Sequence, residues 1–204
     1  MSATKSERPL RADARENREK LLRVASEHFA ANGPDVPLEP IARGASVGIG
    51  TLYRHFPTRE ALIEAVYRNE VDQVCDAADS LLADRPPAEA LAEWMTRFVA
   101  YAATKRGLAG ALKSIAASQA CLFPSTRERM REAISKLLDA GIAAGEIRAD
   151  VSAEDVFTSM NAVWSIDGQG EEWAERALRV LGLLIDGLRF GAGSPAGRGA
   201  VSRA

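Results

Sequence analysis

The sequence has 204 residues, and its 37 alanines outnumber the 28 β-branched residues, a balance that favours helix over strand. Its 26 basic and 28 acidic side chains give a formal charge of −2, without the basic excess typical of a nucleic-acid-binding domain. No run approaches the roughly 18 apolar residues of a membrane span, and the start of the chain is polar, so we expect a soluble, cytoplasmic protein.

The two cysteines do not indicate a metal site or a disulfide framework. Cys75 and Cys121 lie 46 residues apart, without CxxC or Cys/His ligand spacing. We therefore expect structural thiols in a reducing compartment, no bound metal and no cofactor.

The first elements follow from apolar spacing and from helix stop signals. Residues 1–12 are polar and are predicted to form a flexible arm. Leu21, Leu22, Ala25 and Phe29 recur at helical spacing, and Asn32-Gly33-Pro34 ends that helix. Two short apolar blocks follow, 38–42 and 47–56, separated by Arg43-Gly44-Ala45-Ser46. This pattern predicts a helix, a tight turn and a second helix.

The rest of the chain also reads as helix. Thr58 is placed to cap a long helix that could run to Leu82. Further helices are predicted over 88–104, 107–120, 125–144, 152–166 and 171–190, and Ser152 and Asp155 can form a capping box at the start of the helix over 152–166. The tail 191–204 is predicted to be disordered. No segment alternates with period two, so the predicted fold is all-α. We expect an amino-terminal three-helix module over 13–70 and a larger helical module over 71–190.

The distribution of charge changes the meaning of its total. Residues 40–59 contain Arg43, Arg54 and Arg59 and no acidic residue. A basic face on an otherwise acidic protein is compatible with DNA binding, because only the contacted face must displace DNA counterions. An ordinary solvated helix face would give the same count.

The helix, turn and helix pattern favours the DNA-binding interpretation. Ile41, Ala42, Val47 and Leu52 stand where the two helices of a helix-turn-helix pack together. The start of the second helix can approach base edges closely because Gly48 and Gly50 have no side chain. The remaining positions of its outer face carry groups that reach bases or phosphates: Ile49, Thr51, Tyr53, Arg54 and His55.

The run from Leu38 to Leu62, and above all Gly-Thr-Leu-Tyr-Arg-His-Phe-Pro-Thr-Arg-Glu-Ala-Leu at 50–62, resembles the DNA-binding module of the TetR (tetracycline repressor) family of bacterial transcription regulators. The resemblance covers about 13–70. Two positions depart from the family pattern. Ser46 stands where a turn glycine is usual, and Pro37-Leu38 replaces a Thr or Ser that could cap the helix.

The resemblance implies a set of DNA contacts. Ile49, Gly50, Thr51, Tyr53 and His55 would lie at or near base edges, and Tyr53 and His55 could also hold phosphates. Arg59 would hold a phosphate at the start of the next helix, together with the positive helix end. Phe56 reads as core. The full predicted set is Arg43, Gly48, Ile49, Gly50, Thr51, Tyr53, Arg54, His55, Thr58 and Arg59.

The basic residues near the start of the chain leave two interpretations open. Lys5, Arg8, Arg11 and Arg15 could form an arm that reaches the minor groove. Acidic residues interleave with them, so a solvated tail is the alternative.

The carboxy-terminal module offers candidates for an effector cavity and a dimer interface. Trp94, Phe98, Tyr101 and Lys105-x-Gly107-Leu108 look like the ligand-domain pattern of one subgroup of the family. The predicted ligand-binding residues are Trp94, Phe98, Tyr101, Leu112, Met130, Met160 and Trp164, with plain core as the alternative. The resemblance implies a two-fold interface between the last two helices, predicted to use Val156, Met160, Val163, Ala177, Leu181, Leu184 and Leu188.

These observations predict a homodimeric regulator, usually a repressor in this family, released from a palindromic operator in double-stranded DNA when a small-molecule effector binds. An effector-independent DNA-binding dimer is one alternative. An enzyme on a helical bundle is the other, but His28 and His55 lie on different predicted helices and no HExxH motif occurs.

Overall fold

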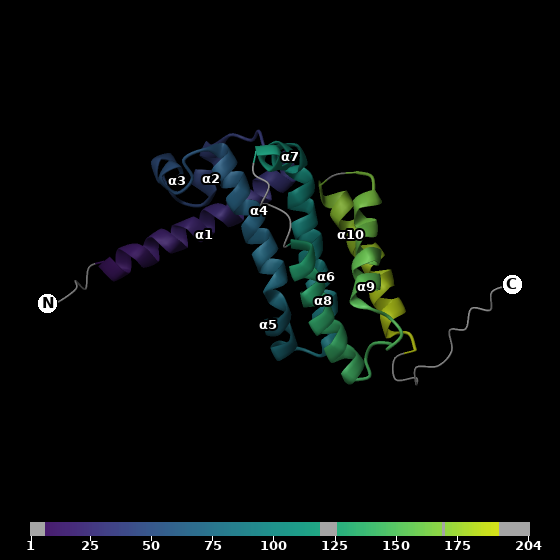
Figure 1. Cartoon of the computed structure of the whole chain (residues 1–204). Coiled ribbons are helices and arrows are strands. Elements are labelled where there is room, and N and C mark those ends of the chain that lie inside the picture. Colours follow the sequence, from purple (N-terminus) through teal and green to yellow (C-terminus); the bar gives the residue numbers. More distant parts are fainter. Residues whose placement is uncertain (1–6, 119–125, 169, 192–204) are drawn as a thin grey trace. The chain divides into compact units, whose positions relative to one another are not determined.

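The computed structural model describes residues 7–118, 126–168 and 170–191 (Figure 1). Regular structure in these residues is entirely helical, which confirms the all-α class. The helices are α1 Glu7–Asn32, α2 Leu38–Gly44, α3 Ile49–His55, α4 Arg59–Cys75, α5 Ala77–Asp84, α6 Pro87–Gly107, α7 Ala109–Ser118, α8 Thr126–Ala143, α9 Ala153–Met160, the 3-10 helix η1 Asn161–Ser165 and α10 Gly170–Arg189. None of these described helices combines the length and the apolar composition that a membrane span requires.

Three predicted boundaries were wrong. Helix α1 begins at Glu7, inside the segment that the sequence predicts to be a flexible arm. The predicted helix from Thr58 to Leu82 is interrupted at Asp76, whose φ of −84° and ψ of −5° end α4 before α5 begins. The predicted helix over 152–166 narrows to 3-10 geometry from Asn161 onward. Lys5, the predicted tail after Gly191, Cys121 and the side chains of Arg8 and Arg11 lie outside what the structure describes.

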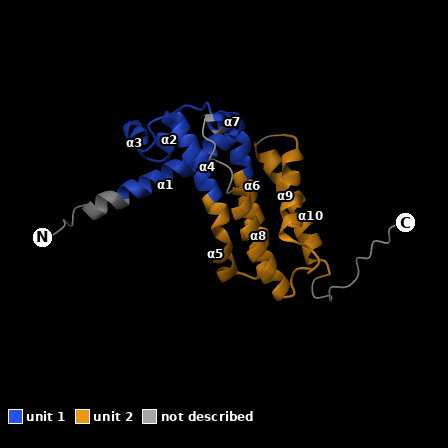
Figure 2. Cartoon of the chain, viewed as in Figure 1, with its two compact units in different colours: residues 1–71, 102–122 blue, residues 72–101, 123–204 orange. Residues whose placement is uncertain are grey.

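The chain divides into two compact units, coloured separately in Figure 2. The first comprises residues 1–71 and 102–122, and the second comprises residues 72–101 and 123–204. The sequence placed 102–122 in the carboxy-terminal module, but the last turn of α6 packs against α1 within the first unit. A Cβ on Gly107 would collide with the backbone carbonyl of Phe29, so only glycine allows this approach.

A buried polar cluster joins three helices of the first unit. The hydroxyls of Ser26 on α1 and Thr104 on α6 lie 2.9 Å apart, and Ser26 also bonds the carboxylate of Glu70 on α4. Burial raises the pKa of Glu70, and the bond from Ser26 opposes part of that shift. Partial burial therefore disfavours the charged form of Glu70 relative to an exposed glutamate.

The raised pKa makes the stability of the protein depend on pH. A carboxyl group whose pKa is higher in the folded than in the unfolded protein stabilises the fold most at pH values below its unfolded-state pKa. That contribution is lost as the pH rises through its folded-state pKa. We expect Glu70→Gln, which keeps a hydrogen-bond acceptor for Ser26, to raise the thermal midpoint more at pH 7.5 than at pH 4.5. Thermal unfolding at both pH values measures this. A Glu70→Gln midpoint shift that does not change with pH would contradict the assignment.

The second unit is held by caps, an indole anchor and surface ion pairs. Ser152 and Asp155 form a reciprocal capping box at the start of α9, as the sequence predicts. The indole N–H of Trp94 donates to the carbonyl of Val74 at 2.8 Å. Arg129 on α8 bonds Asp72 and Asp76 at 2.7 and 3.1 Å.

Candidate nucleic-acid interface

The turn between α2 and α3 has the geometry that a helix-turn-helix needs. The amides of Ala45, Ser46 and Val47 donate to the carbonyls of Ile41, Arg43 and Ala42, respectively, at 2.9 to 3.0 Å. Ser46 has a φ of +58°, and among the described residues it is the only non-glycine in the left-handed region. Ser46 therefore replaces the family's glycine at a position where the backbone still adopts the left-handed conformation. For a residue with an L side chain, this conformation costs about 1–2 kcal/mol.

Ser46→Gly is expected to stabilise the protein. Glycine removes the steric cost of the left-handed conformation, and its larger unfolded-state entropy offsets part of that gain, leaving about 0.5–1 kcal/mol. The midpoint of urea unfolding measures the change. Ser46→Ala is the matched control, because alanine keeps the Cβ, and equal midpoints for the two variants would contradict the explanation.

Close packing fixes α2 and α3 in the first unit. Ile41, Ala42 and Leu52 are buried, as the sequence predicts for the face between the two helices. Gly44, at the end of α2, is a packing residue that the sequence did not single out. A Cβ there would lie 2.9 Å from Cγ1 of Val24 on α1. Pro37 stands at the amino end of α2 without a side-chain cap, so the capping bond that the family's Thr or Ser could make is absent there.

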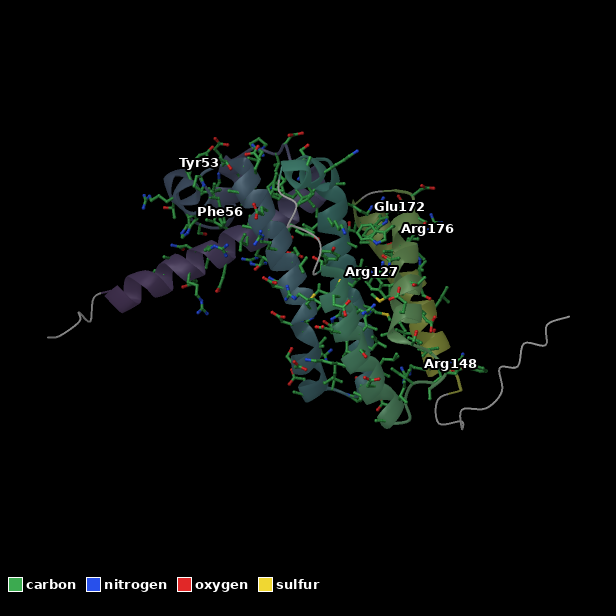
Figure 3. The ribbon with its side chains drawn as sticks, in the orientation of Figure 1. Tyr53, Phe56, Arg127, Arg148, Glu172 and Arg176 are labelled. Carbon is green, nitrogen blue, oxygen red and sulfur yellow. The ribbon has the colours of Figure 1, made fainter. Side chains whose placement is uncertain are left out.

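The outer face of α3 is open. Gly48 is the N-cap residue and Gly50 is the second residue of the helix, and a Cβ on either would have no heavy atom within 4 Å. Tyr53 is 47% exposed and Arg54 is also exposed, whereas Ile49, Thr51 and His55 are half-buried. Phe56 is buried, as predicted, and Figure 3 labels it with Tyr53 at the end of α3. The helix thus presents bare backbone at its start and longer polar side chains further along.

The start of α4 is only partly as expected. The hydroxyl of Thr58 accepts from the amide of Ala61 at 3.1 Å, which confirms the predicted cap. Arg59 is half-buried, and its Nη1 donates to the carbonyls of Pro34 and Val36 at 2.7 and 2.6 Å. The guanidinium therefore ties the connection between α1 and α2 to α4, a role that nothing in the local sequence indicates. Arg43, at the end of α2, is exposed.

Arg59→Ala is expected to destabilise the fold by about 1.5–3 kcal/mol, the usual contribution of hydrogen bonds from a charged group, because two carbonyls are left without their donor. Chemical unfolding measures the change. Arg68→Ala is the matched control on the same helix, because Arg68 pairs with Glu64 at the surface and should change stability little. Equal stability of the two variants would contradict this role.

The predicted ligand-binding residues fall in both units. Trp94, Phe98 and Tyr101 form a buried row along α6 in the second unit, with ring centroids 6.2 and 5.8 Å apart. Met130 and Met160 are also buried there, whereas Leu112 belongs to the first unit. Trp164 is half-buried, and its indole N–H donates to the Asn161 side chain at 3.0 Å. Trp94 serves as a packing anchor, because its polar atom is already bonded to Val74.

Most of the predicted dimer residues are buried within a single chain. This holds for Val156, Met160, Val163, Ala177, Leu181 and Leu188, and Leu184 is half-buried. They fill the core of the second unit, which leaves little of their surface for a second chain. The exposed large apolar side chains of α10 and its end are Leu183 at 73%, Phe190 at 80% and Leu178 at 40%. The signal that could have found them was the presence of apolar residues on more than one side of α10.

Neither a reactive thiol nor a metal-binding group occurs in the described residues. Cys75 is a half-buried free cysteine, and burial raises its pKa to about 11, so the thiol stays protonated. Within the parts of the chain that the structure describes, no three His, Cys, Asp or Glu side chains form a group that could hold a metal ion.

Comparison with known proteins agrees with this geometry. Residues 21–66 match the family model described as bacterial regulatory proteins, tetR family, and residues 86–190 match the C-terminal domain described as transcriptional regulator SbtR-like. A helix-turn-helix-type transcriptional regulator of Staphylococcus aureus, SAR0097, is 34% identical over 83 residues. That match spans 39% of this chain and only 43% of the length of the relative.

Two solved structures are similar over nearly their whole length. The TetR transcriptional regulator SCO0520 from Streptomyces coelicolor is 46% identical with a TM-score of 0.77, and the match covers 84% of this chain and 98% of that one. A TetR transcription regulatory protein from Mycobacterium vanbaalenii is 39% identical with a TM-score of 0.70, covering 89% and 99%.

Proposed function

The chain belongs to the TetR family of bacterial transcriptional regulators, a family of DNA-binding proteins and not of enzymes, and we propose that it is a homodimeric repressor released from a palindromic operator by a small-molecule effector. The observation that carries the proposal is the open face of α3, where Gly48 and Gly50 leave the backbone bare beside Tyr53 and Arg54. A helix that reads DNA bases needs such a face, because its start must approach the floor of the major groove.

We assign the contacts on α3 by their reach. Gly50 and Thr51 bring backbone and a short hydroxyl to base edges, and Tyr53 and His55 reach bases or phosphates. Arg43 and Arg54, on the stretch without acidic residues, hold the phosphate backbone. Phosphate contacts fix the register of the protein, and the α3 contacts select the sequence.

The proposed dimer is required by the distance between the two half-sites of a palindromic operator. Two recognition helices must meet successive major grooves about 34–36 Å apart, which one chain cannot do. Leu183 on α10 and Phe190, the residue after its end, lie seven residues apart, a spacing that puts them on one side of the helix, and both are largely exposed. This face of α10, pairing with its copy about a two-fold axis, is the proposed interface.

The proposed effector binds among the helices of the second unit, where α6 carries the row Trp94, Phe98 and Tyr101. Helices α4 and α6 each have residues in both units, so each can carry a change made in one unit into the other. An effector that prefers the conformation with low operator affinity shifts the protein toward that conformation and weakens operator binding. By linkage, operator DNA lowers the affinity for the effector by the same factor. In the cell this exchange would take place in the cytoplasm.

Selection of bound duplexes from random DNA tests the proposal. Duplexes of about 40 base pairs span two half-sites one helical turn apart, and we expect an inverted repeat to be enriched by the full-length chain. No enrichment over random DNA would overturn the DNA-binding function. A compound that raises the thermal midpoint and releases the enriched duplex supports the effector. Enrichment without any such compound in a broad screen would support an effector-independent dimer.

A further inference from the structure

The face of α1 that packs in the core of the first unit continues toward the amino end, beyond the last core residue. From Leu22 onward, one face of α1 buries Leu22, Ala25 and Phe29 at helical spacing. Extending the same register by four and seven residues toward the amino end brings Arg18 and Arg15 onto that face. The side of α1 that packs on α2 and α3 therefore carries Arg18 and Arg15 where the core ends.

Arg18 lies directly beside the end of the recognition helix. Its guanidinium carbon is 5.4 Å from the centroid of the Phe56 ring, and Phe56 is the residue that follows α3. The ring of His55, the last residue of α3, lies 6.1 Å from that of Phe56. Arg18 is exposed despite this contact, so the cation faces solvent at the edge of the proposed DNA surface.

Two acidic residues near the amino end of α1 point away from Arg18. At about 100° per residue, Asp13 and Glu16 lie on the side opposite Arg18. Glu16 pairs with Lys20 at 2.7 Å on that far side. Arg15 is 83% exposed and pairs with Glu19 at 3.0 Å. An exposed pair of this kind contributes little stability, so Arg15 can exchange its carboxylate for a phosphate at little cost.

We infer that the amino-terminal turns of α1 are a second DNA-contacting element, in which Arg15 and Arg18 bind phosphates of the strand beside the groove that α3 enters. The inference rests on the proposed function, because the position of α3 in the groove decides which strand α1 meets. Helix α1 continues eight residues beyond Arg15 to Glu7, about 12 Å at 1.5 Å per residue, which is comparable with the width of the major groove. From Glu7 onward the chain is helical, where the sequence alone left an arm or a solvated tail open.

A matched pair of arginines on α1 tests the inference. Arg15 and Arg23 are both exposed, and each pairs with a glutamate four residues later, Glu19 and Glu27. Arg23 lies about 140° around the helix from Arg18, away from the DNA face, whereas Arg15 lies only about 60° from Arg18. Arg15→Ala and Arg23→Ala therefore remove the same charge and the same kind of ion pair, but only Arg15 borders the DNA face. Arg18→Ala is less suitable, because it also removes the contact with Phe56.

The measurement is the dissociation constant of each full-length variant for the duplex enriched by selection, over a series of salt concentrations. We expect Arg15→Ala to weaken binding about 5–10-fold at low salt and to reduce the salt slope by about one, the change that follows from one fewer phosphate neutralised. Arg23→Ala should bind within about twofold of the parent, because it makes no phosphate contact. Equal thermal midpoints show that both variants are folded.

The two glutamates give the opposite test. Glu19→Gln frees Arg15 and removes a negative charge near the phosphates, so binding should tighten about threefold, whereas Glu27→Gln should change it little. Equal effects within each pair, or no effect of Arg15→Ala, would overturn the role of α1 and leave the proposed function intact. A parent chain that prefers no duplex over random DNA would instead overturn the proposed function.

Discussion

Gly50→Leu is expected to reduce operator affinity by at least about 100-fold without lowering the stability of the fold. A Cβ at Gly50 meets nothing within 4 Å, so a leucine there points into open space in the free protein. In the proposed complex the same space would be taken by the floor of the major groove. A leucine would hold the start of α3 away from the bases, and the absence of each specific base pairing costs about 1–3 kcal/mol.

The stability of the Gly50→Leu variant should be equal to or higher than that of the parent. Gly50 is the second residue of α3, and glycine in a helix is about 0.5–1 kcal/mol less favourable than residues with better helix propensity. Unfolding experiments should therefore give the variant a midpoint equal to or above that of the parent. Weaker binding together with preserved stability separates a DNA-contacting position from a structural one.

Gly110→Leu is the control for Gly50→Leu. Gly110 is also exposed, is also the second residue of its helix, α7, and also has no heavy atom within 4 Å of an added Cβ. The two substitutions make the same chemical change, at the same position of a helix and in the same unit. Only Gly50→Leu lies on α3. We expect Gly110→Leu to bind the selected duplex as the parent does. Equal binding by both variants would contradict the assignment of α3 as the helix that reads DNA bases.

Leu183→Glu is expected to convert the proposed dimer to a monomer at concentrations where the parent chain would be dimeric. Burial of a leucine contributes about 1.5–3 kcal/mol, and two-fold symmetry counts it twice, so the dimer dissociation constant should rise about 10²–10⁴-fold. Operator affinity should fall with it, because a monomer engages one half-site only. Light scattering coupled to gel filtration measures the mass of each species.

Leu178→Glu controls for the added charge on α10. Leu178 is 40% exposed, against 73% for Leu183, and lies about 140° away from it around the helix. We expect this variant to stay dimeric. A Leu183→Glu variant that remains dimeric and still binds the selected duplex would refute the proposed interface, whatever Leu178→Glu does.

Local patterns in the sequence determined much of this protein. The all-α class, the turn between α2 and α3, the cap at Thr58 and the capping box of Ser152 and Asp155 were all predicted. Each depends on residues no more than five positions apart, whose backbone geometry the residue types themselves limit. The open face of α3 was predictable for the same reason, because the absence of side chains at Gly48 and Gly50 is a property of the sequence.

Only the tertiary structure decided which partners the remaining residues have. Arg59 reads as a phosphate contact in sequence, yet its guanidinium bonds carbonyls more than 20 residues away in the chain. Leu112 reads as part of the carboxy-terminal module, but it belongs to the first unit, where the end of α6 approaches α1 at Gly107. The periodicity of α10 showed that it has apolar faces but not which of them fills the core. Hydrophobic burial is not directional, so long-range packing alone selected the buried face and left Leu183 exposed.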